Sequence, residues 1–229
     1  MVQEIEKSPF ITYQIRQLQD IKDHDGRYEL KFRDGSKKET DWLIAADGRS
    51  SITRTILGVH VEKYTYSQHA LVFTAHLHDG HDNVAHEHFL EQGPLAVLPL
   101  PENRANIVWT LNEQYACDLQ KLGPYIVQDA LNDVLGNTFG LCTVETEIWR
   151  YPLGLHWAQK FGTGKTFFIG DVAHGIHPIA GQGLNLGLRD VATLTEIFRT
   201  RLFTAWPAHE DMQREYERCA GKIVWRLLL

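Results

Sequence analysis

The stretch GDVAHGIHPIAGQGLNLG, residues 170–187, decides the fold of this 229-residue chain. An apolar run at residues 165–169 precedes it and predicts a short buried strand, and helical spacing begins at Leu184. The order is therefore strand, Gly170-Asp171, glycine-rich loop and helix. A carboxylate directly after a strand, here Asp171, can accept hydrogen bonds from hydroxyl groups of a ligand.

The loop that follows suits the approach of a ligand. Gly181 and Gly183 carry no side chain, so backbone N–H groups can come close to a bound group. A helix that begins near Gly183 would stabilise a negative charge there by about 0.3–2 kcal/mol. The alternative is that the glycines only form a tight turn. The acid, the proline and the helix occur together in this order, which favours a ligand site.

A long helix is predicted from Leu184. Its apolar face comprises Leu184, Leu188, Val191, Leu194, Thr195, Phe198 and Leu202. Pro207 ends this helix because proline lacks the backbone N–H, and a last helix is expected from His209 onward.

A second acid follows a predicted strand at residues 44–51, IAADGRSS. A short helix is expected at residues 50–57, closed by Gly58. Asp47, next to Gly48, can bind a hydroxyl of a ligand, and Arg54 can hold Asp47 or a phosphate. The alternative is an ordinary turn between a strand and a helix, capped by Ser50 or Ser51.

Alternating apolar residues predict strands elsewhere. Near the start we expect strands at residues 11–15, 28–32 and 37–46, with Asp34-Gly35 as a hairpin turn. The middle of the chain predicts closely spaced strands, which indicate an antiparallel sheet, at residues 70–78, 86–90, 95–100, 106–111 and 142–151. One helix, at residues 119–135, interrupts this series.

Composition excludes several classes of protein. The charged residues number 23 basic against 29 acidic, a net charge of −6, which argues against a nucleic-acid partner. The apolar runs, such as residues 42–46 and 95–100, are far shorter than the ~20 residues of a membrane-spanning helix. Three widely spaced cysteines form no disulfide framework and indicate a reducing compartment.

The histidines do not indicate a metal site. His76, His78, His81, His86 and His88 lie close together in the sequence. Asp171, His174 and His177 also have a spacing that zinc sites use. The first group lies in a polar hairpin region and the second lies inside the glycine-rich loop, so we expect no bound metal.

The two acid-bearing motifs make the chain resemble a known family. It resembles the single-component flavin-dependent aromatic hydroxylases of the para-hydroxybenzoate hydroxylase type. LIAADGRSSITR is similar to their DG motif, and FFIGDVAHGIHPIAGQGLNLGLRDVATL is similar to their GD motif. The stretches HPIAGQGLNLGLRDV, AHEHFLEQGPLAVLPLPENRANIVWT and WRYPL are similar to the ubiquinone-biosynthesis branch, the 2-polyprenylphenol hydroxylases. The resemblance covers most of residues 10–220.

This resemblance implies a monooxygenase that hydroxylates a prenylated phenol with FAD, O2 and NAD(P)H, the last as a transient donor. It nominates no catalytic side chain. The residues that it implies for cofactor binding are Asp47, Gly48, Arg54, Gly170, Asp171, Pro178, Ala180, Gly181, Gln182, Gly183, Leu184 and Asn185. Asp171 would contact the ribityl chain, and Pro178 with residues 180–183 would line the isoalloxazine. Asp47 and Arg54 would border the pyrophosphate and the groove for the nicotinamide donor.

The implied fold is α+β. Residues 1–64 and 151–229 would form a partial FAD-binding domain, and residues 65–150 an antiparallel-sheet substrate domain. The family's first unit, a strand, a GxGxxG loop and a helix, binds the ADP half of FAD, and no GxGxxG follows any predicted strand here. We therefore expect a truncated protein whose 229 residues hold no tightly bound FAD and are inactive alone.

Two rival functions stay open. One is a soluble hydroxylase of small polar phenols, and the other is a non-catalytic assembly subunit that retains the flavin-loop scaffold. We expect a cytoplasmic protein, with peripheral contact at the inner membrane as the alternative. A ubiquinone-biosynthesis complex and a homo-oligomer are the assemblies that we consider. Residues 218–229 could lie on a membrane surface, but a packing helix is the favoured interpretation.

Overall fold

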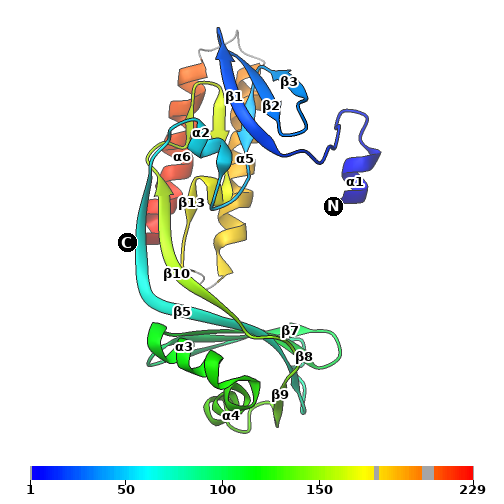
Figure 1. Cartoon of the computed structure of the whole chain (residues 1–229), viewed down its shortest axis with the longest axis vertical. Helices are drawn as coiled ribbons and strands as arrows, with labels where there is room; N and C mark the ends of the chain where they lie inside the picture. Colours follow the sequence, from blue (N-terminus) through cyan, green and yellow to red (C-terminus); the bar gives the residue numbers. More distant parts are fainter. Residues whose placement is uncertain (1, 178–180, 203–208, 229) are drawn as a thin grey trace. The chain divides into compact units, whose positions relative to one another are not determined.

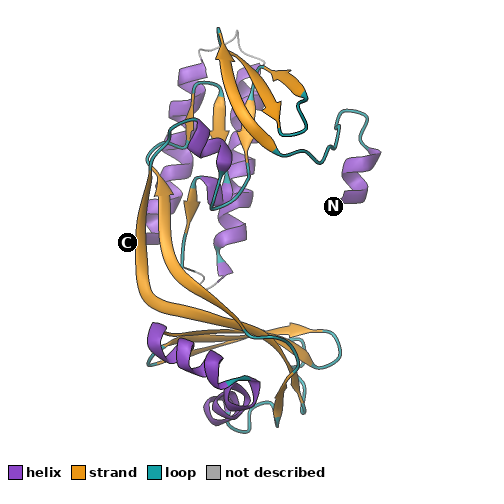
Figure 2. Cartoon of the chain, in the orientation of Figure 1, coloured by secondary structure: helices purple, strands orange, loops and turns teal. Residues whose placement is uncertain are grey.

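The computed structural model describes residues 2–177, 181–202 and 209–228, and it is a mixed α+β structure (Figure 1). The chain forms two compact units. The first comprises Met1–Glu62, His156–Gly175 and Gly181–Leu229, and the second comprises Lys63–Leu155 and Ile176–Ala180. Each unit contains both helices and strands (Figure 2).

A three-stranded antiparallel sheet opens the first unit, after helix α1 (Val2–Lys7). Its strands are β1 (Leu18–His24), β2 (Arg27–Phe32) and β3 (Lys37–Thr40). The predicted hairpin turn is confirmed: Gly35 has φ +81°, and the Asp34 carboxylate accepts hydrogen bonds from the Ser36 amide and hydroxyl. The predicted strand at residues 11–15 is wrong. These residues are irregular and exposed, because alternation alone supplies no partner strand.

A second sheet of the first unit contains a parallel pair. Its order is β11 (Gly162–Thr163), β12 (Thr166–Phe168) and β4 (Leu43–Ala45). Strand β12 runs parallel to β4, with Phe168 opposite Ala45. The single strand predicted at residues 37–46 is therefore wrong, because β3 and β4 belong to different sheets. The predicted short helix is confirmed as α2 (Ile52–Ile56).

Helices α5 (Gly183–Leu202) and α6 (His209–Leu228) build the core of this unit with the parallel sheet. Phe167 lies at its centre, with its ring against Trp42, Phe198 and Tyr216. From α6, Met212, Tyr216 and Ala220 are buried, which favours the packing-helix interpretation for this part of α6. The side chains of residues 222–229 lie outside those described.

The predicted apolar face of α5 is wrong in its first half. Leu184, Leu188 and Val191 are exposed, whereas the buried positions are Leu186, Asp190, Leu194 and Ile197. An open apolar groove of about 630 Å³ lies alongside, lined by Trp42, Ile44, Ile169, Val191, Leu194, Thr195, Phe198 and Arg199. Among the described residues, no other helix or strand covers the exposed stripe of Leu184, Leu188 and Val191. Helical periodicity therefore could not indicate which apolar residues of α5 would be buried.

One large sheet, most of whose strands lie in the second unit, has the order β13-β10-β5-β8-β7-β6, and β9 pairs with β5. The bounds of these strands are β5 (Val61–Leu77), β6 (His86–Leu90), β7 (Gly93–Leu100), β8 (Arg104–Asn112), β9 (Cys142–Val144), β10 (Trp149–Ala158) and β13 (His174–Gly175). The predicted antiparallel series is confirmed, except that the strand predicted at residues 142–151 is two strands. The predicted domain boundaries, at 64/65 and 150/151, fall inside β5 and β10, which pass from one unit into the other.

Helices α3 (Glu113–Leu122) and α4 (Pro124–Leu135) cover one face of this sheet (Figure 1). The single helix predicted at residues 119–135 is wrong, because Gly123 adopts φ +92° and Pro124 starts a new helix. Beneath these helices, Leu71, Trp109 and Leu131 are buried in the core.

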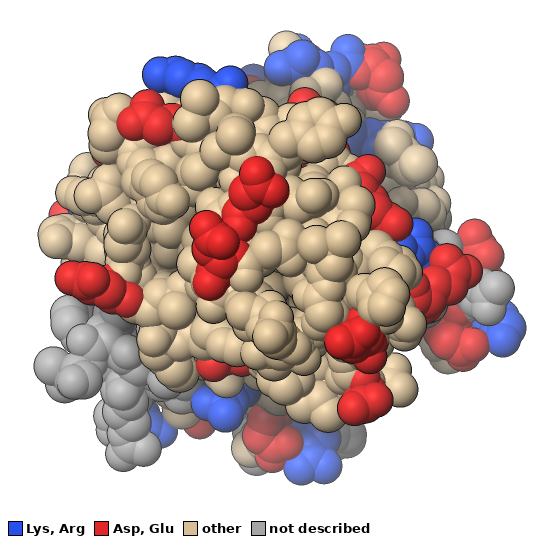
Figure 3. All heavy atoms as spheres, turned by 90° about the horizontal axis from the view of Figure 1, so that it is seen from below, with Lys and Arg blue, Asp and Glu red and all other residues tan. Residues whose placement is uncertain are grey.

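The face that carries α3 and α4 is acidic. Figure 3 views the molecule from that side, and Asp and Glu side chains are spread over it with few Lys or Arg among them. Helix α4 itself contains Asp129 and Asp133 and no basic residue. This face would repel a polyanion. Among the described residues, no helix is both long enough and apolar enough to cross a membrane.

The core of the first unit can be tested with two phenylalanines. We expect Phe167→Ala to lower the free energy of unfolding by about 3–5 kcal/mol, because it leaves a cavity among three aromatic rings. Phe10→Ala is the matched control, since Phe10 is 94% exposed, and we expect a change within about 0.5 kcal/mol. Urea unfolding curves measure both. Equal losses in the two variants would contradict the assigned core.

Candidate functional site

Parallel pairing brings the two predicted motifs together. Strand β4 ends at Ala45, two residues before Asp47, and β12 ends at Phe168, two residues before Gly170. Because β4 and β12 run parallel, both turns lie at the same edge of their sheet. In doubly wound proteins ligands bind at that edge. The structure thus places Asp47, Gly48, Arg54, Gly170 and Asp171 in one region.

The turn after β12 is a 3-10 helix, η1 (Gly170–Val172), held in place by side chains from four other elements. Gly170 adopts φ +58°, which a residue with a side chain seldom does. Three side chains bond to the backbone of this turn: Gly170 N donates to Asp190 Oδ2 at 2.8 Å, His156 Nε2 donates to Asp171 O at 2.8 Å, and Arg54 Nη1 donates to Val172 O at 2.6 Å. A fourth, Tyr216 Oη, donates to Phe168 O at 2.8 Å, at the end of β12 just before the turn. The backbone therefore has little freedom to move.

Asp171 is the exposed member of this turn. Its backbone carbonyl is held by His156, but its side chain is exposed. In the part of the chain that the structure describes, no hydrogen bond involves the Asp171 carboxylate. A carboxylate on a rigid turn, with its oxygens unbonded, is suited to accept hydroxyl groups from a ligand.

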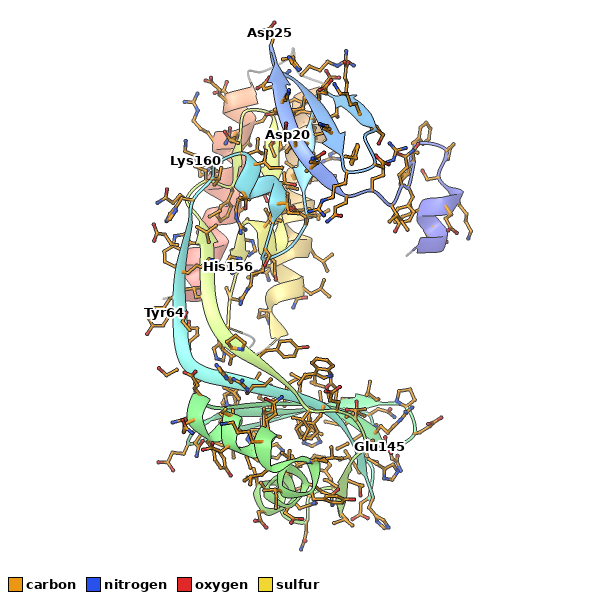
Figure 4. The ribbon with its side chains drawn as sticks, viewed as in Figure 1. Asp20, Asp25, Tyr64, Glu145, His156 and Lys160 are labelled. Carbon is orange, nitrogen blue, oxygen red and sulfur yellow. The ribbon has the colours of Figure 1, made fainter. Side chains whose placement is uncertain are left out.

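His156 projects from β10 toward the turn (Figure 4). Burial lowers the pKa of His156 below its ordinary value, the bond to Asp171 opposes this shift, and the charges of Arg49 and Arg54 add to it. His156 is therefore neutral at pH 7, with the proton on Nε2 donated to Asp171. Gly175 lies beside the ring, and a Cβ at that position would overlap the imidazole.

A buried hydrogen-bonded pair of side chains lies behind the same turn. His174 Nε2 donates to Asp190 Oδ2 at 2.8 Å, and both side chains are at most 4% exposed. Burial first, and then the charge of Asp190, raise the pKa of Tyr216. Tyr216 thus stays protonated and can donate to the backbone of β12.

The turn after β4 is organised around Asp47. Its Oδ1 accepts the Ser51 hydroxyl at 2.6 Å and its Oδ2 accepts the Thr53 amide at 3.0 Å. Ser51 also caps α2, because its Oγ accepts the Arg54 amide at 2.9 Å. Burial acts to raise the pKa of Asp47, but the bonds from Ser51 and Thr53 outweigh it and hold the pKa below its ordinary value. The predicted serine cap is thus confirmed at Ser51, and the binding of a ligand hydroxyl by Asp47 stays a prediction.

Arg54 links the two motifs. Its side chain is buried, with Nη1 on the Val172 carbonyl and Nη2 on the Arg49 carbonyl at 2.8 Å. Burial lowers the pKa of Arg54, and the charge of Asp47 opposes this shift. Arg54 therefore connects the turns to each other, and a direct contact of Arg54 with a cofactor stays a prediction.

The glycine-rich loop lies partly outside the described residues, which leaves Pro178 and Ala180 unplaced. Gly181 has φ +60°, and a Cβ at Gly181 or Gly183 would meet no atom of the described residues within 4 Å, which leaves room for a ligand on that side. Leu184 begins the exposed stripe of α5, and Asn185 Nδ2 donates to Gln182 Oε1 at 3.3 Å.

Sequence reasoning missed three of the residues that hold the turn. His156, Asp190 and Tyr216 lie on β10, α5 and α6, and no local motif relates them to Asp171. The one available signal was Asp190 itself, since an acid in the buried stripe of an amphipathic helix requires a partner. Among the described residues, no group of three His, Cys, Asp or Glu side chains could hold a metal ion.

A profile of the protein family described as "FAD binding domain" matches residues 1–228. Ubiquinone hydroxylase UbiL of Rhodospirillum rubrum is 37% identical over 163 residues, which are 71% of this chain and 38% of that protein. Ubiquinone biosynthesis monooxygenase COQ6 of Drosophila melanogaster is 32% identical over 231 residues, 86% of this chain and 48% of that protein. The chain thus spans about half or less of the length of these curated relatives.

Solved structures support the fold. PqsL from Pseudomonas aeruginosa superposes with a TM-score of 0.80 at 20% identity, over 97% of this chain and 64% of that chain. CmlS, a flavin-dependent halogenase, superposes with a TM-score of 0.70 at 17% identity, over 90% of this chain and 39% of that chain. At these identities the likeness establishes the fold alone.

The Asp47–Ser51 network predicts a pH-dependent loss of stability. We expect Ser51→Ala to cost about 1 kcal/mol at pH 7, because the helix cap and the bond to Asp47 are lost. The wild-type pKa of Asp47 is lower in the folded protein than in the unfolded chain. The contribution of the Asp47 carboxylate to the free energy of unfolding is therefore complete above the pKa in the unfolded chain, about 3.9. This contribution is lost as the pH falls through the lower pKa in the folded protein.

Urea unfolding at pH 7, 5 and 3.5 measures this difference. The difference in the free energy of unfolding between wild type and Ser51→Ala should be smaller at pH 3.5 than at pH 7. Ser50→Ala, at the neighbouring exposed serine, is the control and should show no such gap. A gap that is constant with pH would contradict the role of Asp47.

Proposed function

The chain belongs to the FAD binding domain family, and we propose that it forms the flavin-side and substrate-side parts of an FAD-dependent monooxygenase of ubiquinone biosynthesis. In this proposal the substrate is a phenol ring with a prenyl chain, and O2 and NAD(P)H are the other reactants. FAD supplies the redox chemistry, because no side chain can activate O2 by itself. The names of UbiL and COQ6 support the pathway.

The observation that carries the proposal is the Asp171 carboxylate. It projects from a turn whose backbone bonds are satisfied by buried side chains, and its own oxygens are unbonded among the described residues. A flavin cofactor bears hydroxyl groups on its ribityl chain, which are the donors that such a carboxylate accepts. The residues present therefore fit FAD at this position.

The start of α5 supports the same assignment. The helix begins at Gly183, directly after the open backbone at Gly181. Its N-terminal end would favour negative charge on a bound ring by about 0.3–2 kcal/mol. No side chain at these two positions would block the approach of a flat ring.

The open face of the large sheet favours an apolar substrate. On the face opposite α3 and α4, Val72 lies beside Val108, and Val108 lies beside Ala96 in adjacent strands. Leu98, two residues along β7, is 39% exposed on the same face and lies beside Asn106 of β8. This apolar row resembles a surface for a hydrocarbon chain rather than for a charged ring substituent.

A small polar phenol is the less favoured alternative. It would call for a cation that is available to bind a substrate carboxylate. Arg104 lies at one end of the same face, but its Nη2 is 3.1 Å from Glu102 Oε2 and its Nε donates to Pro101 O. Peripheral membrane contact and assembly with other enzymes stay predictions.

FAD retention tests the site. In the complete gene product, we expect Asp171→Ala to weaken FAD binding about 10- to 100-fold, because hydrogen bonds to a charged group contribute about 1.5–3 kcal/mol. Titration of the flavin-free protein with FAD, followed by flavin fluorescence, measures the dissociation constant. The control is Asp133→Ala on α4, in the other unit, which should bind FAD as wild type does. Wild-type affinity in Asp171→Ala would contradict the assignment, and a wild type that takes up no FAD would favour a non-catalytic subunit.

Substrate class is tested at Leu98. We expect Leu98→Ser to raise the KM for a long-chain prenylphenol about tenfold, because about 1–1.5 kcal/mol of apolar burial is lost. The KM for the same phenol with its chain removed should stay within about twofold. Leu122→Ser, at an exposed leucine where α3 ends, is the matched control. An unchanged KM for the prenylphenol, with rapid turnover of small phenolic acids, would favour the alternative.

A further inference from the structure

Asp190 ties the two ends of the turn that carries Asp171. Its Oδ2 accepts the Gly170 amide and the His174 Nε2–H, each at 2.8 Å. These two donors flank Asp171, one position before it and three positions after it. One oxygen atom on α5 thus closes the segment from Gly170 to His174.

Burial alone does not favour a carboxylate at this place. The Asp190 and His174 side chains are nearly completely buried, and burial of a charge costs free energy that a partner only partly returns. Apolar residues of similar volume often replace buried ion pairs without loss of stability. What an apolar residue cannot supply is the acceptor for both donors.

Other side chains restrain the backbone of the same turn at Asp171 and at the residue after it. His156 fixes the Asp171 carbonyl and Arg54 fixes the next carbonyl, at Val172. Gly187, one turn before Asp190 on α5, lies against the turn, since a Cβ there would be in ordinary van der Waals contact with Gly170 Cα, at 3.5 Å. The helix and the turn are therefore in direct contact where the bonds form.

We propose that Asp190 is a positioning residue for the cofactor: it holds both ends of the turn so that the Asp171 carboxylate points outward in one fixed direction. The inference rests on the proposed function, because it assumes that Asp171 binds FAD. Asp190 itself is buried in the core and acts only through the turn.

The experiment is a double-mutant cycle in the complete gene product, with the FAD dissociation constant as the readout. We expect Asp190→Leu to raise this constant tenfold or more, since displacements of about 1 Å are costly in a preorganised site. Asp190→Asn keeps an oxygen that can accept both donors and should stay within about threefold of wild type. In an Asp171→Ala background, Asp190→Leu should change the constant less than about twofold.

A purely structural role gives a different pattern. If Asp190 were only structural, Asp190→Leu would raise the FAD dissociation constant by the same factor in the Asp171→Ala background as in wild type. That result would overturn the inference. Wild-type affinity in Asp190→Leu would overturn it as well. Unfolding midpoints without FAD establish that each variant is folded. If Asp190→Leu does not fold, His174→Phe removes one of the two bonds and should raise the constant at least threefold, again only when Asp171 is present.

The cycle separates this inference from the proposed function. A wild-type protein that binds no FAD refutes the proposed function itself. A wild type that binds FAD and is weakened by Asp171→Ala, yet is unaffected by Asp190→Leu, refutes only the positioning role.

Discussion

Parallel pairing of β4 with β12 is the constraint on which the site depends. It brings two turns that are distant in sequence to one sheet edge, and each turn carries an aspartate. The pairing alone would leave two flexible loops. Side chains from α2, α5, α6 and β10 then bind the second turn, so that the backbone becomes part of the core while one carboxylate stays exposed.

The two aspartates illustrate how similar motifs acquire different tasks. Asp47 uses both oxygens within the protein, where it helps Ser51 to cap a five-residue helix. Asp171 follows its strand by one residue more, after Gly170 rather than before a glycine, and the contacts of that turn are made by its backbone. A polar group already satisfied by the fold gains little from a ligand, whereas an unbonded one can gain a full hydrogen bond. In our proposal Asp171, rather than Asp47, is therefore the main ligand-binding carboxylate.

Local signals predicted the local structure well and the long-range structure poorly. The Asp34-Gly35 hairpin and helix α2 follow from nearby turn and capping residues, and the structure confirms them. The exposed stripe at Leu188 contradicts the predicted face of α5, because periodicity shows that a helix has an apolar side but not what covers it. The contacts of His156 and Asp190 span 15 and 20 residues of sequence and cross between elements, so no motif could reveal them.

The bond between Arg54 and the Val172 carbonyl joins residues 118 positions apart, with the sequence of the second unit between them. On a ribosome that adds about 5–20 residues per second, the guanidinium emerges roughly 6–24 s before its acceptor. During that interval the guanidinium of Arg54, which is buried in the folded protein, must remain hydrated. The turn that carries Asp47 cannot yet pack against the turn that carries Asp171. Assembly of the cofactor site is thus a late event of biosynthesis, after the intervening sheet has had time to form.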